Sequence, residues 1–440
     1  MTPAIAGILG LLIFLIIMFL GMPVSYAMLL TGFWGLCFLR SPAAAFNIIS
    51  KDIFTNFSSY SLTVVPMFVF MGFVAYYSGI GSGLFRLSHK LIGHRRGGLA
   101  LAAQLACALF GAICGSLAAS VATIGTIAYP EMKKYKYGDI LAASSIAAGA
   151  SIGSLIPPSV LFIIYGIATE QSIGRLFMAG VLPGILLTAA NMVTIYILCK
   201  RDPSLGPAGE KADRKEILAT IKTDGLIEVI LVFVVSLGGL FIGWFTPTEA
   251  GAVGAIALLV LTLFEKKMDL NKLKLALFDT TKLSAMIFLL IAGAVVYGRF
   301  FALSRIPFQL SSWVTAFNLP NFAVMAIIIV IYLILGCVID ALALILLTVP
   351  IFYPLVVNTM GYDPIWFGVI ILLVTVMGSI TPPVGLNIYI MKSVAPSVRV
   401  ETLFKGVWPF VGALLVCIAI IIAFPSIATW LPNLIFGSMG

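Results

Sequence analysis

The sequence predicts an all-α polytopic membrane protein made of two inverted-topology repeats, and three observations support this prediction. Hydrophobic residues make up 61% of the 440 residues, charged residues only 10%, and the mean hydropathy is +1.14. A water-soluble fold of this length needs a larger polar shell. Apolar runs of roughly 20 residues, enough for a helix to cross a bilayer, recur along the chain. Finally, the motifs GSLIPP at 153–158 and GSITPP at 378–383 interrupt two such runs, 225 residues apart.

The composition excludes several classes of function. The net charge of +9 comes from Lys and Arg in short loops beside apolar runs, which is the positive-inside pattern and gives no reason to expect a nucleic-acid partner. The six cysteines are scattered without a CxxC pair, so we expect neither a disulfide framework nor a metal centre built on them. The sequence contains no HExxH, Walker A or GxSxG motif. We therefore expect a transporter driven by an ion gradient, and not an enzyme.

The first repeat is predicted to occupy residues 1–205. Its first apolar run has no basic residues before it, and we expect it to be retained as a scaffold helix. Region 98–130 is too long for one simple span and has small residues near its middle, so we predict a re-entrant helical hairpin. Lys and Arg flank both of its ends, which places both ends in the cytoplasm. The remaining elements are spans at 4–21, 23–40, 60–80 and 174–199, and a broken helix at 139–169.

A polar linker, 206–224, is predicted to lie in the cytoplasm before the second repeat, 225–440. No Lys or Arg lies between Arg305 and Lys392, so both ends of a second predicted hairpin, 321–356, are expected on the outside. Each repeat has five full spans, an odd number, which inverts the second repeat and places both chain termini outside. The remaining elements are spans at 226–246, 248–264, 281–303 and 406–433, and a broken helix at 364–395.

The two Pro-Pro motifs are the first candidate for chemistry. Each removes two backbone donors and pushes the preceding residue out of helical geometry, which frees carbonyl groups at membrane depth. Oxygen atoms are the ligands that Na⁺ prefers, and paired broken helices mark the binding site in many secondary transporters. The alternative interpretation is a pair of proline kinks satisfied by neighbouring helices. Nearby hydroxyl groups belong to Ser154, Ser159, Ser379 and Thr381.

The hairpins supply further candidates. Ser116 and Ser120 lie near the middle of the first hairpin and are predicted to face the first break, although small residues there also suit close helix packing. Asp340 is the only ionisable residue in a long apolar run of the second hairpin. A carboxylate in that position is predicted to bind Na⁺ or carry a proton, because an unpaired buried charge is costly. Its alternative role is to cap a helix at the hairpin turn.

Two other polar residues are candidates for substrate binding. Arg299 lies near the end of its span, where it either binds a substrate carboxylate through two hydrogen bonds or extends to the membrane surface. Asn387 follows the second break and carries both a donor and an acceptor. It either contacts substrate or forms a hydrogen bond between helices.

Several motifs resemble one transporter family. The stretch FTPTEAGAVGA at 245–255, together with GMPVSYAMLLTG at 21–32 and the two Pro-Pro motifs, is similar to the large membrane subunit of TRAP (tripartite ATP-independent periplasmic) transporters, the DctM-like family. The resemblance implies an elevator-type, Na⁺-coupled importer of a small organic anion such as a C4-dicarboxylate or sialic acid. It also implies a bacterial inner-membrane location, where the outside termini predicted above are periplasmic, with a small four-helix membrane subunit and a periplasmic substrate-binding protein as partners.

The resemblance also implies a set of site residues. The substrate would contact Arg299, Ser116, Ser159 and Asn387. At least two Na⁺ sites are implied, one in each repeat. Ser120 departs from the wider ion-transporter class, in which an amide is frequent at this position. The implied Na⁺ ligands are Ser116, Ser120, Gly153 and Pro157 in the first repeat, and Gly336, Asp340, Gly378, Thr381 and Pro382 in the second.

Other functions remain open from the sequence. A stand-alone cation:dicarboxylate symporter of the same architecture would need no binding protein, and uptake by this chain alone would distinguish it. A membrane-embedded enzyme lacks a recognisable catalytic group here. A channel is less consistent with two oppositely oriented hairpins, which suit alternating access.

Overall fold

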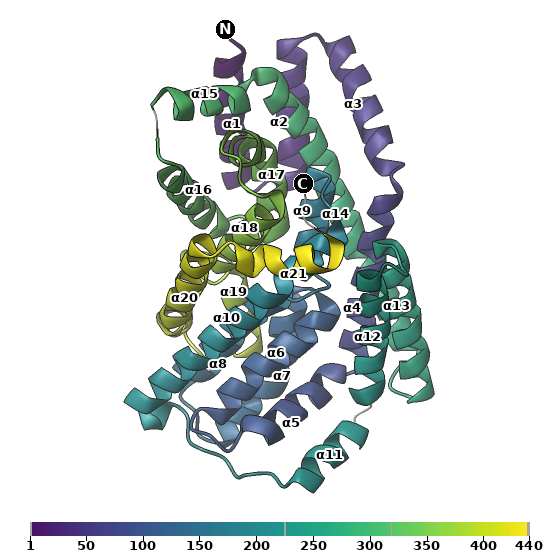
Figure 1. Cartoon of the computed structure of the whole chain (residues 1–440), viewed down its shortest axis with the longest axis vertical. Helices are drawn as coiled ribbons and strands as arrows, with labels where there is room; N and C mark the ends of the chain where they lie inside the picture. The colour runs from purple at the N-terminus through teal and green to yellow at the C-terminus, as the bar shows by residue number, and fades with distance from the viewer. Residues whose placement is uncertain (1, 224–225, 318, 438–440) are drawn as a thin grey trace.

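The computed structural model describes residues 2–223, 226–317 and 319–437, and all regular structure within them is helical (Figure 1). Six helices of the described chain are long and apolar enough to cross a bilayer. The predicted all-α polytopic class is therefore confirmed. The predicted boundary between linker and second repeat, at 224 and 225, and the final residues 438–440 lie outside the described residues.

The N-terminal region contains one helix that the sequence analysis did not predict. The predicted spans 4–21, 23–40 and 60–80 correspond to α1, α2 and η1 with α4. Between them lies α3, which starts because the Oγ of Ser41 accepts a 3.2 Å hydrogen bond from the backbone N–H of Ala44. Ala45 is the only residue of α3 that is buried. The bounds are α1 (Pro3–Phe19), α2 (Val24–Leu39), α3 (Pro42–Phe57), η1 (Tyr60–Thr63), α4 (Val64–Tyr77) and α5 (Ile80–Ile92).

The region predicted as the first hairpin contains two helices that reverse at Gly115. Gly115 has a left-handed φ of 58°, and a Cβ atom there would lie 2.3 Å from the carbonyl oxygen of Pro158. Only glycine fits both conditions. The tip of the hairpin therefore rests directly on the first break. The bounds are α6 (Gly98–Cys114), α7 (Leu117–Lys134), α8 (Asp139–Gly149), η2 (Ala150–Ser154), α9 (Val160–Thr169) and α10 (Ile173–Arg201).

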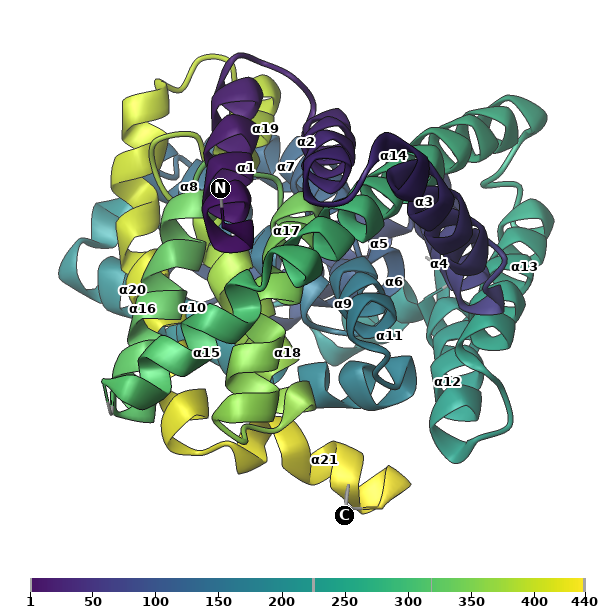
Figure 2. The ribbon, with the colours of Figure 1, turned by 90° about the horizontal axis from the view of Figure 1, so that it is seen from above.

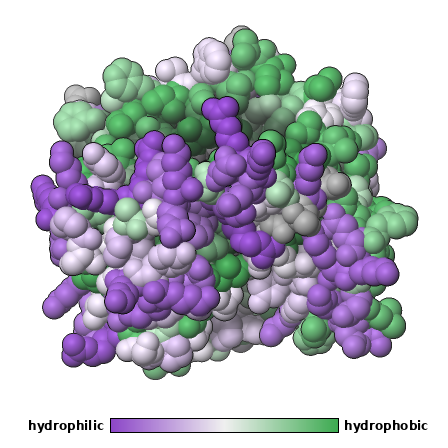
Figure 3. All heavy atoms as spheres, turned by 90° about the horizontal axis from the view of Figure 1, so that it is seen from below, coloured by the Kyte–Doolittle hydropathy of each residue, from purple (hydrophilic) through white to green (hydrophobic). Residues whose placement is uncertain are grey.

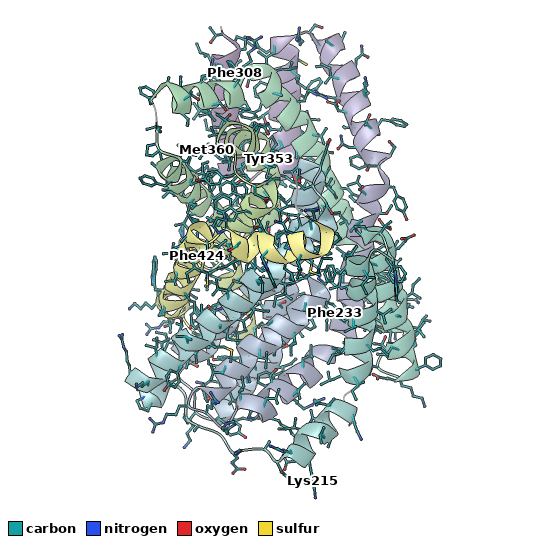
Figure 4. All side chains as sticks on the ribbon, viewed as in Figure 1. Lys215, Phe233, Phe308, Tyr353, Met360 and Phe424 are labelled. Carbon is teal, nitrogen blue, oxygen red and sulfur yellow. The ribbon has the colours of Figure 1, made fainter. Side chains whose placement is uncertain are left out.

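The second half contains a matching set of helices, with one boundary that the sequence did not reveal. The predicted single span 406–433 is wrong: α20 ends at Ala423, and Figure 4 shows Phe424 at the bend before α21. Phe424 precedes Pro425 and leaves helical geometry, with φ −127° and ψ 76°, since proline disfavours the helical conformation in the residue before it. The bounds are α12 (Leu226–Ile242), α13 (Pro247–Phe264), α14 (Leu270–Ser304), α15 (Ile306–Ala316), α16 (Asn321–Gly336), α17 (Ala341–Tyr353), η4 (Pro354–Thr359), α18 (Pro364–Gly378), α19 (Leu386–Val394), α20 (Val400–Ala423) and α21 (Ser426–Phe436).

The stretch FTPTEAGAVGA contains the N-terminal capping box of α13. The Oγ1 of Thr246 accepts from the backbone N–H of Glu249 at 3.3 Å, and the Glu249 carboxylate accepts from the backbone N–H of Thr246 at 2.8 Å. Pro247 occupies the first turn, where no donor is needed. The motif thus fixes the start of one scaffold helix.

The end of the molecule that contains α11 (Arg214–Thr223) is rich in polar side chains. In Figure 1, α11 lies at one end and α15 with the N-terminus at the other. Seen from below, the end with α11 is covered with hydrophilic side chains (Figure 3), and Lys215 points away from the protein in Figure 4. Phe308 on α15 is 68% exposed at the opposite end. Figure 2 shows α12 and α13 forming one edge, with α3 beside α14.

The linker between the repeats is bound across the base of the first hairpin. Gly97 donates its backbone N–H to Gly206 at 2.8 Å, and Gly138 donates to Leu205 at 3.1 Å. Gly97 directly precedes α6, and Gly138 lies between α7 and α8. The segment at Leu205 and Gly206 therefore contacts both the start and the end of the hairpin. Tyr137 completes the contact: its hydroxyl accepts from the N–H of Leu99 at 3.1 Å and donates to the carbonyl of Pro207 at 2.9 Å. Burial raises the pKa of Tyr137 to about 12, so the donating proton is retained at neutral pH.

Replacing Tyr137 by Phe is expected to destabilise this base. The buried N–H of Leu99 and the carbonyl of Pro207 both lose their partner, and leaving a buried donor unpaired costs about 1–3 kcal/mol. Thermal unfolding of the purified chain in detergent measures the loss. Tyr135→Phe is the matched control, since Tyr135 lies in the same turn and is 41% exposed. Equal stability of the two variants would show that the linker contact is not structural.

Candidate functional site

Each hairpin lies against the break of its own half through a pair of glycines. A Cβ atom on Gly111 of α6 would lie 2.0 Å from the Cα of Gly153. In the second half, a Cβ atom on Gly378 would lie 2.5 Å from the carbonyl carbon of Gly336. Gly336 follows Gly111 by 225 residues, and Gly378 follows Gly153 by 225 residues, the same separation as between the two Pro-Pro motifs. Backbone therefore touches backbone at equivalent positions in the two halves.

A cavity of about 480 Å³ lies where the two hairpin tips meet. Ser116 lines it from the first tip and Asp340 from the second. Val160 and Leu386 line it just after the two breaks. The opposite wall comes from the start of α2 and from α14. Both halves of the chain thus contribute to one cavity of a size usual for small-molecule sites.

Five helices begin at this cavity: four start at the hairpin tips and after the breaks, and the fifth, α2, starts at the opposite wall. Ser116, Asp340, Ser159 and Gly385 are the N-caps of α7, α17, α9 and α19, and the first residue of each helix lines the cavity. Unpaired backbone N–H groups give a helix N-terminus a partial positive charge that attracts anions. Among the residues that the structure describes, no Lys or Arg lines the cavity. Attraction of an anion would therefore come from the backbone.

The side chains at the two tips already serve the helix starts. The Oγ of Ser116 accepts from the N–H of Ala119 at 3.4 Å, and Oδ2 of Asp340 accepts from the N–H of Leu342 at 3.0 Å. Asp340 is thus a helix cap, as the alternative interpretation had it, and its carboxylate also reaches the cavity. Because a carboxylate accepts several partners, the cap leaves oxygen lone pairs free for a cation.

Near the first break, the predicted Na⁺ ligands lie among buried oxygens. Ser120 is fully buried, and its Oγ lies 3.4 Å from the Sγ of Cys114. A Cβ atom on Gly153 would lie 3.1 Å from this Oγ, so the two predicted residues are neighbours. The hydroxyl of Ser154 donates to the carbonyl of Ser151 at 2.9 Å. The Oγ of Ser151 is buried without a hydrogen-bond partner, which the sequence analysis missed. Pro157 is also buried.

Near the second break, the hydroxyl groups donate backward along the chain. Ser379 donates to the carbonyl of Val376 and Thr381 to that of Met377, each at 2.7 Å. A hydroxyl that donates to a carbonyl keeps its lone pairs as potential cation ligands. A smaller cavity of about 140 Å³ is lined by Gly336, Asp340 and Ser379 among others, whereas Thr381 and Pro382 lie outside its lining.

Two predicted substrate residues lie behind the cavity and do not line it. Ser159 is fully buried, and its Oγ accepts from the N–H of Phe162 at 3.3 Å. Asn387 is also fully buried and donates its Nδ2 to the carbonyl of Ala147 in α8 at 3.3 Å. Its Oδ1 has no partner in the described structure. Asn387 therefore joins the second break to the first half of the chain.

Arg299 lies away from the other residues that were predicted to bind substrate. Its Nε lies 2.6 Å from Oδ2 of Asp52 and its Nη2 lies 2.8 Å from Oδ1, a bidentate ion pair that joins α14 to α3. The Arg299 side chain is 50% exposed and does not line the cavity. No sequence pattern indicated this partner, since the two residues are 247 positions apart. In this structure the guanidinium is held by a carboxylate of the protein itself.

A double-mutant cycle of Arg299→Gln and Asp52→Asn tests what this pair does. Because Arg299 is half exposed, we expect a coupling of about 0.2–1 kcal/mol in thermal unfolding. If the pair only joins the two helices, each single variant reduces uptake no more than the double variant. A larger loss of uptake with Arg299→Gln than with Asp52→Asn would instead support the prediction that Arg299 binds the substrate.

Comparison with known proteins identifies the family. The sequence model of the "Tripartite ATP-independent periplasmic transporter, DctM component" matches residues 11–427. This chain belongs to the DctM family. It is therefore a multi-pass membrane subunit of a TRAP transporter and not an enzyme, and the resemblance noted in the sequence is confirmed.

Curated DctM relatives align along almost the full chain. The C4-dicarboxylate TRAP transporter large permease protein DctM of Pseudomonas aeruginosa is 35% identical over 90% of this chain and 91% of its own length. The sialic acid TRAP transporter large permease protein SiaM of Vibrio cholerae is 33% identical over 99% of both chains. The 2,3-diketo-L-gulonate TRAP transporter large permease protein YiaN of Escherichia coli is 31% identical over 93% of this chain and 94% of its own length.

The DctM fold has a counterpart among solved structures. The Alcanivorax borkumensis YdaH transporter, whose crystal structure is described as having an unusual topology, aligns with a TM-score of 0.65. The alignment covers 88% of this chain and 90% of that one at 15% sequence identity. At this identity the match shows the fold alone.

One part of the DctM site escaped the sequence analysis. The α14 wall of the cavity contains Leu283, Met286, Ile287 and Leu290, which share one face of the helix. The spacing was visible in the sequence, but an apolar helical face in a membrane protein faces lipid as readily as a cavity. Only the packing of the two halves distinguishes these cases.

Proposed function

We propose that this DctM chain is the large subunit of a Na⁺-coupled importer of a small organic anion, working by an elevator movement. The observation that carries the proposal is the single cavity formed by both hairpin tips and the starts of both post-break helices. Glycine contacts tie each hairpin to its break, so these elements are suited to move as one body. The α2 and α14 wall would be the fixed scaffold.

The site chemistry supports separate places for cation and anion. Na⁺ would be held in the first half by oxygens around Ser116, Ser120 and the Gly153–Pro157 break. In the second half it would be held around Asp340 and the Gly378–Pro382 break, with Gly336 and Thr381. No group of three or more His, Cys, Asp or Glu side chains occurs in the described structure, and Na⁺ needs none because hydroxyl and carbonyl oxygens suffice. The substrate carboxylate would lie at the four helix N-termini.

The proposal includes two partners and a location. Family membership supports a small membrane subunit, a periplasmic substrate-binding protein and a location in the bacterial inner membrane. The charges of the loops and the number of spans favour both termini in the periplasm. The isethionate TRAP transporter permease protein DctMQ of Oleidesulfovibrio alaskensis matches 94% of this chain, but the match covers only 64% of that longer protein. The extra length in that relative supports a second membrane component as a partner of the large subunit.

Two measurements test the proposal. First, thermal unfolding of the purified chain is compared in NaCl and KCl at equal ionic strength, because a ligand of the native state raises stability by mass action. We expect a saturable shift with Na⁺ only. Second, uptake into proteoliposomes is measured with and without the small subunit and binding protein. Uptake should require both partners and an inward Na⁺ gradient. Uptake by this chain alone would support the stand-alone symporter, and flux without saturation would indicate a channel.

A further inference from the structure

The lining of the main cavity has very few polar side chains. Among the described residues that line it, only Ser25, Ser116 and Asp340 carry a polar side-chain group. Ser116 and Asp340 already accept backbone hydrogen bonds at their helix starts. Ser25 is 6% exposed. The cavity therefore offers a bound molecule little side-chain hydrogen bonding beyond the helix N-termini.

The part of the opposite wall that α14 contributes is aliphatic. Leu283, Met286, Ile287 and Leu290 lie on one face of α14 and line the cavity, and Met286 is 45% exposed. Such a wall stabilises a substrate body made of methyl and methylene groups at about 25 cal/mol per Å² of apolar surface removed from water. It supplies no partner for hydroxyl groups. Each buried hydroxyl without a partner costs roughly 1–3 kcal/mol.

The charges in the cavity point to a single carboxylate. The four helix N-termini meet at the hairpin tips, where one carboxylate would find backbone donors. A second carboxylate at the other end of the molecule would face the wall of α2 and α14, where the N-terminus of α2 at Val24 offers backbone donors but no cationic side chain is present among the described lining residues. A dicarboxylate would therefore have one carboxylate at four helix N-termini and the other at the start of α2 alone.

We infer that the substrate is a short monocarboxylate with a mostly apolar body, in preference to a sugar acid or a dicarboxylate. The inference rests on the proposed function, since it takes the cavity at the hairpin tips as the transport site. The inference reduces the candidate substrates from organic anions in general to apolar monocarboxylates.

Three six-carbon acids of similar size separate the classes: 4-methylpentanoate, D-gluconate and adipate. The first is an apolar monocarboxylate, the second has five hydroxyl groups, and the third has a second carboxylate. Dissociation constants are obtained from thermal-unfolding titrations of the purified full chain, in NaCl and again in KCl. We expect 4-methylpentanoate to bind at least about tenfold more tightly than the other two acids, because unpaired polar groups are rejected strongly.

Met286→Gln tests whether the wall is responsible. Glutamine keeps the length of methionine and adds an amide, so we expect the preference over gluconate to fall about fivefold. Leu275→Gln is the matched control, since Leu275 lies on α14 outside the cavity and is 49% exposed. Its preference should equal that of the wild type. An unchanged preference in Met286→Gln would overturn the inference.

The outcomes distinguish this inference from the proposed function. Tighter Na⁺-dependent binding of gluconate or adipate would overturn the substrate class and leave Na⁺ coupling intact. Tighter binding of 4-methylpentanoate in both salts would support the class and contradict coupling. If none of the acids binds in either salt, the substrate class is overturned together with the placement of the anion in this cavity.

Discussion

Replacing Asp340 by Asn is expected to remove most of the sodium response of this transporter and to leave its fold almost unchanged. The carboxylate reaches both cavities and keeps lone pairs free beside its bond to the N–H of Leu342. Loss of its charge should weaken Na⁺ binding by about 10- to 100-fold, or roughly 1.4–2.7 kcal/mol. Asn caps helices about as well as Asp, so stability without Na⁺ should change by only a few tenths of a kcal/mol. Thermal unfolding with increasing NaCl measures both quantities.

Asp269→Asn is the matched control for this variant. Asp269 caps α14 in the same way, accepting from the N–H of Lys272 at 2.8 Å, but it lies outside both cavities. Its sodium response should match the wild type. A wild-type sodium response in Asp340→Asn would show that the residue is a helix cap only. Na⁺ coupling, if present, would then depend on the hydroxyl and carbonyl oxygens of the breaks.

Replacing Gly111 by Ala is expected to be the most destabilising of the single changes considered. The new Cβ would lie 2.0 Å from the Cα of Gly153, which is backbone and has no flexible end to move aside. Inserting a methyl group into such a contact costs about 3 kcal/mol, at the upper end of overpacking effects. The hairpin would separate from the break, so Na⁺-dependent stabilisation should be lost together with stability. Thermal unfolding and the yield of folded protein in detergent report the change.

Gly412→Ala provides the control for helix propensity. Gly412 lies within α20, and no atom comes within 4 Å of a Cβ built there. Alanine should therefore be neutral, or stabilising by about 0.5–1 kcal/mol. A Gly111→Ala variant as stable as Gly412→Ala would mean that the hairpin and the break are not in close contact.

Much of the fold was visible in the sequence because apolar runs, helix-capping residues and proline act locally. The Pro-Pro motifs broke the helices where predicted, and Ser116, Asp340 and Ser159 each start a helix. The helix α3 and the break at Phe424 were missed, since short polar-apolar segments beside spans give a weak pattern. These features are local in origin, but their signals are too weak to recognise without coordinates.

Contacts between residues that are far apart in the sequence could not be predicted. Sequence identified Gly111, Gly153, Gly336 and Gly378 as small residues near hairpins and breaks, but not that they touch in pairs. It proposed that Arg299 faces a substrate, while the structure pairs it with Asp52. It gave no sign that Met286 and Leu290 face a cavity. Each of these facts depends on how distant helices pack.

By itself, the sequence determined that this protein is a membrane-spanning helical transporter of the DctM family, with two similar broken helices and a carboxylate at a hairpin tip. These properties depend on hydropathy, on the backbone chemistry of proline and on motifs within short stretches. Only the tertiary structure decided that the tips of both hairpins share one cavity, that glycine pairs hold them there and that an aliphatic wall faces them. Contacts between residues tens to hundreds of positions apart, such as Gly111 with Gly153 and Arg299 with Asp52, arise from packing, and no local pattern encodes which pairs meet.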